Sequence, residues 1–248
     1  ARLLQSPECV FHCLVNDRNG YRLPWMIKHN IKASKLKMYQ KHLQDYDTVF
    51  RYFGPTLRNL ELQLQCGELN NDYNVEAYTK IRHIKNEEAM YECFRHCPYL
   101  EQLTMDCFKA PGERSWMACL PDRFATVLNT LPHLKMINFK ACADINEAIV
   151  NAMCRAPNLT EICIGRSSTF ATGAFVIAVP NPTVQKVQTA SVGFCALFPN
   201  LQEVHLFERP SADVATLAAS CKHIKFAYFT LTDTMDMTTA ATVCYNWK

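Results

Sequence analysis

A short pattern of apolar positions, Pro-x-Leu-x-x-apolar-x-apolar, recurs along the chain at uneven intervals. Its last positions alternate apolar and polar residues, which is typical of a strand that buries one face. Six copies occur, the last without the proline: Pro55–Leu62, Pro98–Met105, Pro132–Phe139, Pro157–Ile164, Pro199–Leu206 and Lys222–Phe229. Because five of the 12 prolines fall in this one context, the pattern indicates a repeated structural unit.

Segments with helical periodicity precede several of these strands. Met90, Tyr91 and Phe94 lie on one helical face before the second copy, and Phe124–Leu131 is predicted to be helical before the third. A longer apolar stripe, with Asp144 as its expected N-cap, precedes the fourth copy: Ile145, Ala148, Ile149, Ala152 and Met153. Each unit is therefore predicted to contain a helix, a turn with proline and a short strand.

One such unit cannot bury both of its apolar faces, so neighbouring units must stack. We therefore expect an α/β solenoid of about six irregular repeats, with parallel strands on the concave face and helices on the convex face. The first residues of the copies are 43, 34, 25, 42 and 23 positions apart. The sequence predicts insertions in the longer intervals, at Gly67–Asn86, Ala110–Pro121 and Gly165–Lys186. Within the last of these, the apolar Phe170–Val179 is either an added strand or a partner-contact patch.

The strand core of all six copies, Leu-x-x-apolar-x-apolar, resembles that of the leucine-rich repeat family. In four copies a Cys, Leu, Ala or Phe stands before Pro-x-Leu, which is similar to the repeats of F-box proteins. The resemblance covers roughly residues 45–230. It implies a solenoid that recognises other proteins.

The end of the chain is similar to the second half of an F-box, which reads Asp-Leu, five residues, then Val-Cys-x-x-Trp. The matching residues here are Asp236-Met237 and Val243-Cys244-Tyr245-Asn246-Trp247. The resemblance implies that a Skp-type adaptor binds Met237, Val243, Cys244 and Trp247. No first half is evident upstream, although Leu3–Val10 resembles the stretch that follows an F-box Trp. The alternative is a helix that caps the last repeat.

These resemblances divide the chain into three parts. Residues 1–44 are a helical N-terminal cap or post-F-box segment, residues 45–231 the leucine-rich repeat solenoid, and residues 232–248 a helix with the F-box-like half motif or a cap. They imply the substrate-binding subunit of a Skp–cullin–F-box ubiquitin ligase, with the adaptor, the cullin scaffold and an unidentified target protein as partners. A leucine-rich repeat scaffold or assembly factor without a ligase link is the alternative.

Charge and hydropathy argue against binding of nucleic acid and against insertion into a membrane. The net charge of +3 gives little support to binding of nucleic acid or of a membrane surface. No apolar stretch approaches the roughly 20 residues of a membrane span. Ile27–Leu43 holds five lysines and no acid, which we interpret as a solvated helix face, with a nucleic-acid contact as the alternative.

The reactive side chains do not form a catalytic pattern. The 13 cysteines, an odd number, indicate a reducing intracellular compartment in which most of them are buried apolar groups. A zinc site at Cys93, His96 and Cys97 is the alternative, but no second ligand pair follows. Because motifs of hydrolases, metalloenzymes and nucleotide-binding loops are missing, we expect neither an enzyme nor a cofactor or metal. Asn158-Leu159-Thr160 matches a glycosylation acceptor, but its place in a predicted strand favours a structural role.

The polar residues between the buried positions of each strand point away from the core. Stacking aligns them in columns across the concave sheet, the surface that solenoids use for binding. We predict that a partner protein contacts these columns: Gln102, Thr104, Asp106, Met136, Asn138, Lys140, Glu161, Cys163, Glu203, His205, Phe207, Phe226 and Tyr228. The three aromatic residues at the far end are the expected anchors, unless Thr232–Lys248 covers them as a cap.

Overall fold

The computed structural model describes residues 10–12, 14–18, 20–39, 46–65, 90–108, 121–140, 145–165, 179–207, 217 and 220–229. In these ranges the chain is a mixed α/β structure in which nine strands form one parallel sheet, ordered β11-β10-β9-β8-β7-β6-β5-β4-β2. A second, two-stranded sheet pairs β1 (Val10–Phe11) with β3 (Lys32–Ala33). The predicted α/β class with parallel strands is confirmed.

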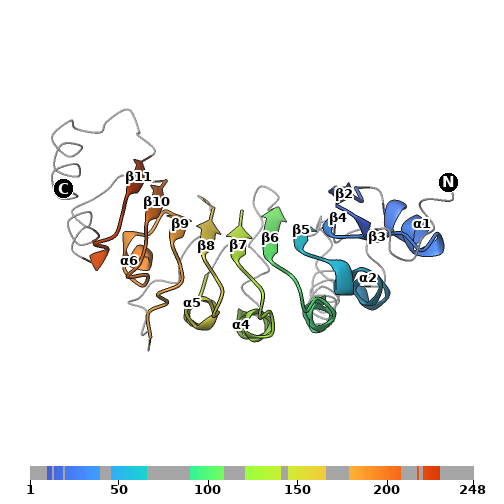
Figure 1. Ribbon diagram of the computed structural model, residues 1–248, viewed down its shortest axis with the longest axis horizontal. Helices are drawn as coiled ribbons and strands as arrows, with labels where there is room; N and C mark the ends of the chain where they lie inside the picture. Colours follow the sequence, from blue (N-terminus) through green and yellow to red (C-terminus); the bar gives the residue numbers. More distant parts are fainter. Residues whose placement is uncertain are drawn as a thin grey trace, which may run out of the picture.

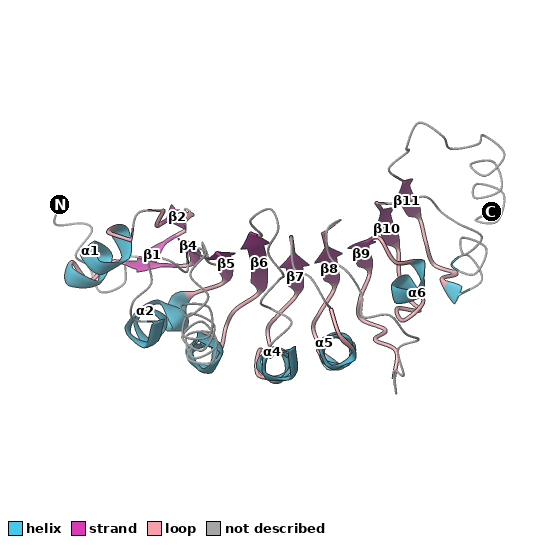
Figure 2. Cartoon of the chain, turned by 180° about the vertical axis from the view of Figure 1, so that it is seen from behind, coloured by secondary structure: helices cyan, strands magenta, loops and turns pink. Residues whose placement is uncertain are grey.

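The two layers follow a shallow arc, with strands on its inner side and helices on its outer side (Figure 1; Figure 2 from behind). The large sheet contains β2 (Val15–Asn16), β4 (Lys35–Tyr39), β5 (Asn59–Gln65), β6 (Gln102–Phe108), β7 (Met136–Phe139), β8 (Glu161–Ile164), β9 (Lys186–Thr189), β10 (Glu203–Leu206) and β11 (Phe226–Phe229). The helical segments are α1 (Arg22–Lys28), α2 (Tyr46–Phe53), η3 (Gly54–Thr56), η4 (Phe94–His96), α4 (Pro121–Asn129), α5 (Glu147–Arg155) and α6 (Val192–Cys195).

One backbone arrangement recurs at the start of successive strands. The carbonyl oxygen of Arg58 accepts from the amides of Glu101 and Gln102, at 2.7 and 2.9 Å. Six further carbonyl oxygens each accept in the same way from two consecutive backbone amides of the next strand: those of Ser34, Glu101, Lys135, Thr160, Gln185 and Gln202. Equivalent positions of neighbouring units therefore lie side by side, as in a solenoid.

The core lies between the sheet and the helices. The register aligns Leu103, Ile137 and Ile162, each 0 % exposed, across three neighbouring strands. From the helical layer Phe124 packs on Phe139, with ring centroids 5.7 Å apart in an edge-on arrangement. Alternation in the strands and a 3.6-residue period in the helices thus bury the predicted apolar positions against one another.

The N-cap of helix α5 (Glu147–Arg155) lies two residues after the predicted one. The side chain of Asn146 accepts from the backbone amide of Ile149 at 3.1 Å, so Asn146 is the N-cap. Asp144 lies outside the described residues. Asn caps a helix as well as Asp does, because either side-chain oxygen can satisfy a free amide of the first turn.

The predicted insertion at Gly165–Lys186 is wrong at its C-terminal end. Strand β9 begins at Lys186 and joins the large sheet between β8 and β10. Val184 and Val187 are 0 % exposed and occupy the positions of the first two apolar residues of the strand pattern, after Pro182. The pattern is hidden because Val replaces Leu and the buried Thr189 replaces the last apolar residue.

The interpretation of Ile27–Leu43 as a solvated helix face is also wrong. Residues 35–39 form strand β4, which pairs with β5 along its whole length. Leu36 and Met38 are 1 % exposed and enter the core, so the intervening lysines face the other way. The predicted helical cap over residues 1–44 differs from the structure as well, since β2 and β4 continue the sheet and α1 is the one helix among the described residues of this segment.

Cys93 and Cys97 are 4 % and 0 % exposed, and burial raises the pKa of the Cys97 thiol to about 12. A protonated, buried thiol is a packing group and a poor metal ligand. Across the described ranges, no three His, Cys, Asp or Glu side chains lie together as a metal site would need.

No helix in the same ranges is long and apolar enough to cross a membrane.

Candidate binding face

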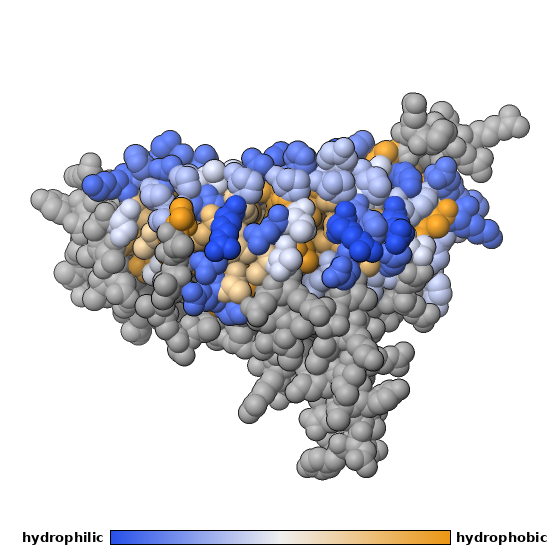
Figure 3. Space-filling model, turned by 90° about the horizontal axis from the view of Figure 1, so that it is seen from below, coloured by the Kyte–Doolittle hydropathy of each residue, from blue (hydrophilic) through white to orange (hydrophobic). Residues whose placement is uncertain are grey.

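The inner face of the sheet brings the predicted residues together in two rows. Strand register aligns the first row, Gln102, Met136, Glu161, Lys186, Glu203 and Phe226. It aligns the second row as Thr104, Asn138, Cys163, Gln188, His205 and Tyr228. Asp106 lies on β6 two residues beyond Thr104, and Lys140 and Phe207 directly follow β7 and β10. On the outer side of the molecule, hydrophilic and hydrophobic residues lie mixed together (Figure 3).

At the β4–β7 end, two lysines share one carboxylate, and we name Lys37, Glu61 and Lys140 the lysine-rich cluster. The Glu61 Oε1 atom accepts from Lys37 Nζ at 2.6 Å and from Lys140 Nζ at 3.0 Å. Burial alone would raise the pKa of Glu61, but the hydrogen bonds and charges of both lysines hold it below its ordinary value. The hydrogen bond that Lys37 donates to Glu61 in turn raises the pKa of Lys37. Glu61 and Lys37 are therefore both charged at neutral pH.

At the β8–β10 end the ratio is reversed, and we name Glu161, Lys186, Glu203 and His205 the carboxylate-rich cluster. Lys186 Nζ lies 3.3 Å from Glu161 Oε1 and 3.5 Å from Glu203 Oε1. His205 Nε2 lies 2.7 Å from Glu203 Oε1. This hydrogen bond, followed by the charge of Lys186, lowers the pKa of Glu203. One ammonium group thus lies between two carboxylates.

Aromatic side chains extend this cluster onto β11. The ring of Tyr228 stacks on that of His205, with centroids 4.3 Å apart and planes inclined by 24°. Phe226 and Tyr228 are 57 % and 50 % exposed, whereas Phe207 is half-buried. The segment 232–248, which was the alternative cover for these rings, lies outside the described residues, as do Met237, Val243, Cys244 and Trp247.

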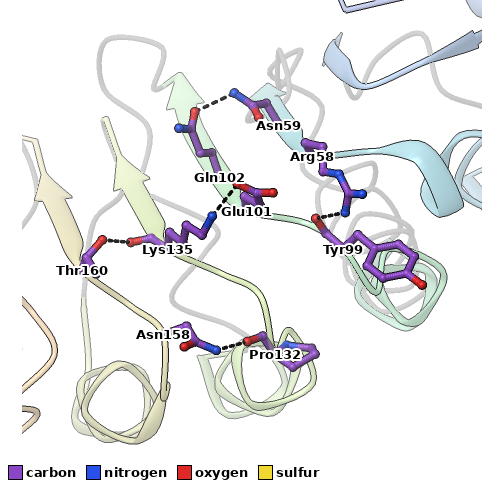
Figure 4. Close-up of polar contacts among 9 residues, drawn as sticks. All are labelled: Arg58, Asn59, Tyr99, Glu101, Gln102, Pro132, Lys135, Asn158 and Thr160. Carbon is purple, nitrogen blue, oxygen red and sulfur yellow. Dashed lines mark hydrogen bonds and ion pairs between the residues drawn. The ribbon is translucent and has the colours of Figure 1, made fainter. Parts of the chain in front are cut away.

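Polar contacts at the strand starts hold neighbouring units in register (Figure 4). Asn59 donates to the Gln102 side chain at 2.6 Å, and Lys135 donates to Glu101 at 2.9 Å (Figure 4). The Asn158 amide donates to the carbonyl of Pro132 at 2.6 Å, which supports the structural role predicted for this residue. These contacts fix the spacing of the strands, and with it the spacing of the side chains on the inner face.

Among the face residues that the sequence did not reveal are Lys37, Glu61, Lys186 and Gln188. Glu61 occupies the same position in the first copy as Thr104 does in the second. The strict alternation of Lys35-Leu36-Lys37-Met38 is a strand signal that the density of lysines concealed. Recognition of Pro182-x-Val184-x-x-Val187 as a further copy would have supplied Lys186 and Gln188.

Glu61→Gln is expected to lower the free energy of unfolding by about 0.5–1 kcal/mol at pH 7, in the upper range for partly exposed ion pairs. Because the folded-state pKa of Glu61 lies below its ordinary 4.5, this stabilisation is present above that pH. It is lost as the pH falls through the folded-state pKa. Urea unfolding at pH 7, 5, 4 and 3 should therefore give curves for wild type and variant that converge in acid. A difference independent of pH would contradict the ion-pair assignment.

The inner face offers charged side chains held in ion pairs and two exposed aromatic rings, an arrangement that suits recognition of another molecule. A scan against protein-family models and a search of curated proteins both find no match to this chain.

Proposed function

We propose that the chain is a leucine-rich repeat protein that recognises another protein with the inner face of its sheet. The observation that carries this proposal is the exposure of Phe226 and Tyr228 beside the carboxylate-rich cluster. Large aromatic rings on a solvated strand gain little from folding, whereas interface energy concentrates on such residues.

The recurring backbone arrangement supports the repeat assignment. Seven successive carbonyls, from Ser34 to Gln202, accept two amides each from the following strand. The intervals between the equivalent prolines Pro157, Pro182 and Pro199 are 25 and 17 residues, so a 42-residue gap contains two units. With β4 and β9 counted, the units begin near residue 31 and continue to residue 229.

We further propose that the chain is the substrate-binding subunit of a Skp–cullin–F-box ubiquitin ligase. The support for this step is the resemblance of residues 236–247 to the second half of an F-box. The inner face would then hold the target protein, and the C-terminal segment would hold the adaptor. A scaffold or assembly factor would use the same face without the adaptor.

Tyr228→Ala is expected to weaken the partner at least tenfold, since truncation of an aromatic anchor costs about 2 kcal/mol or more. The melting temperature should change little, because half of the side chain is already exposed. Affinity capture with the wild type and with the variant identifies proteins that the wild type retains more strongly. These proteins are purified, and the Kd of each is measured for the wild type and for the variant. The matched control is Tyr99→Ala, whose side chain is 45 % exposed but lies at the strand-start edge, off the inner face. Equal losses in both variants would exclude the anchor role.

Trp247→Ala is expected to reduce retention of a purified Skp-type adaptor at least tenfold, since a terminal Trp would be its largest anchor. Binding of the target to the inner face should be unaffected. If the adaptor binds equally well to a variant that combines Trp247→Ala with Val243→Asp, the F-box interpretation is wrong. If the wild type does not bind the adaptor, the scaffold function is the one that stands.

A further inference from the structure

The charges on the inner face are separated into two ends of opposite sign. The lysine-rich cluster has two ammonium groups for one carboxylate, and the carboxylate-rich cluster has two carboxylates for one ammonium group. Near the first cluster, the charges of Lys35 and Asp106 cancel each other. Near the second, Lys225 donates to the Gln202 side chain at the edge and does not join the cluster. The face therefore holds about one excess positive charge at the β4–β7 end and one excess negative charge at the β8–β10 end.

The sheet fixes the distance between these two ends. Glu61 and Lys186, the central residues of the two clusters, lie on β5 and β9, which are four strands apart. Strands are about 4.8 Å apart, so the two centres are separated by roughly 19 Å. The side chains between them, Thr104, Asn138 and Cys163, are uncharged. An extended chain advances about 3.3 Å per residue, so it spans this separation in about six residues.

The negative end has the chemistry that a guanidinium group requires. Glu203 and Glu161 provide carboxylate oxygens, and Phe226 and Tyr228 provide exposed ring faces on the neighbouring strand. A guanidinium group can stack on an aromatic face while it donates two hydrogen bonds to a carboxylate. An ammonium group offers only a compact charge with no planar surface to stack.

We propose that the inner face binds an extended protein segment with an acidic side chain over the lysine-rich cluster and an arginine over the carboxylate-rich cluster, about six residues apart. This inference rests on the proposed function, protein recognition by this face, and adds the chemistry of the partner. A nucleic acid strand fits the face poorly, because its continuous phosphate charge would meet Glu161 and Glu203 at one end.

The proposal is tested with synthetic peptides of twelve residues, each with one Glu and one Arg in an Ala/Ser background. The Glu and the Arg are two, four, six or eight residues apart, and each spacing is made with Glu before Arg and with Arg before Glu. Binding is followed by NMR chemical-shift titration at low salt. The peptides with a spacing of about six are expected to bind about fivefold more tightly than those with a spacing of two, since only they can reach both clusters. Replacement of Arg by Lys should remove most of this advantage, because the stacking contact is lost.

Matched variants locate the two contacts. Glu203→Gln should abolish the preference for Arg over Lys, and Lys37→Met should abolish the preference for Glu over Gln in the peptide. Glu101→Gln, whose carboxylate pairs with Lys135 at the edge, should leave both preferences unchanged. If affinities do not depend on spacing or on these variants while Tyr228→Ala still weakens a captured partner, the charge pairing is wrong and protein recognition stands. If Tyr228→Ala has no effect either, both proposals are overturned.

Discussion

Phe139→Ala is expected to lower the free energy of unfolding by about 3–5 kcal/mol, the range found for truncation of a buried Phe. Phe139 is 0 % exposed and stands between Met105 and Ile164 of the neighbouring strands. Its ring also packs edge-on against the ring of Phe124, whose centroid in turn lies 5.6 Å from that of the Tyr91 ring. The substitution leaves a cavity where sheet and helices meet, and it removes both the transfer energy and the ring contact. Chemical denaturation monitored by circular dichroism measures the loss.

Phe226→Ala is the control for this substitution, because it removes the same atoms from a side chain that is 57 % exposed. It should change the free energy of unfolding by only about 0.5 kcal/mol, as surface substitutions do. A similar cost for the two variants would mean that Phe226 is part of a core and is not an anchor for a partner. A cost below about 1 kcal/mol for Phe139→Ala would contradict the packing between β7 and α4.

The strand layer was largely predictable because its signal is local. In each of the six copies, successive strand residues alternate between core and inner face, so the pattern alone identifies strands and their outward side chains. β7, β8, β10 and β11 fall within the predicted copies, and β5 and β6 begin in their copies and extend three residues beyond them. Besides the two-residue strands β1, β2 and β3, the strands that were missed are β4 and β9, which lack the proline or the leucine that marks the others. Their buried positions hold Ala33 and Val184 instead, both 0 % exposed.

The charge clusters were not predictable, because they join residues that are distant in sequence. The hydrogen bonds of Glu61 span 24 positions to Lys37 and 79 positions to Lys140. Only the register of β4 through β7 brings these side chains together, and β4 had been interpreted as a helix face. The exposed aromatic end was predicted because Phe226 and Tyr228 lie in a recognised copy. The stacking of Tyr228 on His205 depends on the β10–β11 register as well.

The inner face also depends on close contact between strand ends. Gly165 follows β8 and donates its amide to the Phe139 carbonyl at 2.6 Å. A Cβ atom at this position would overlap the carbonyl oxygen of Lys140 and lie 2.6 Å from the carbonyl carbon. These are backbone atoms of the neighbouring strand, so they cannot rotate away as a flexible side chain would. Gly165 therefore sets how closely β7 and β8 approach, at the boundary between the two charge clusters.

Gly165→Ala is accordingly expected to lower the free energy of unfolding by about 3 kcal/mol, at the upper end for overpacked sites. Chemical denaturation measures the loss. A peptide spaced for both clusters should also bind less tightly, since separation of β7 from β8 increases the distance between the two clusters. Gly193→Ala is the control: the nearest atom to its added Cβ is Ser191 Oγ at 4.0 Å, and it lies in α6. There alanine should be neutral or stabilise by about 0.5–1 kcal/mol, because glycine is the poorer helix former. A neutral Gly165→Ala alongside a stabilising Gly193→Ala would mean that β7 and β8 can separate at no cost, and that the two clusters are not held at a fixed distance.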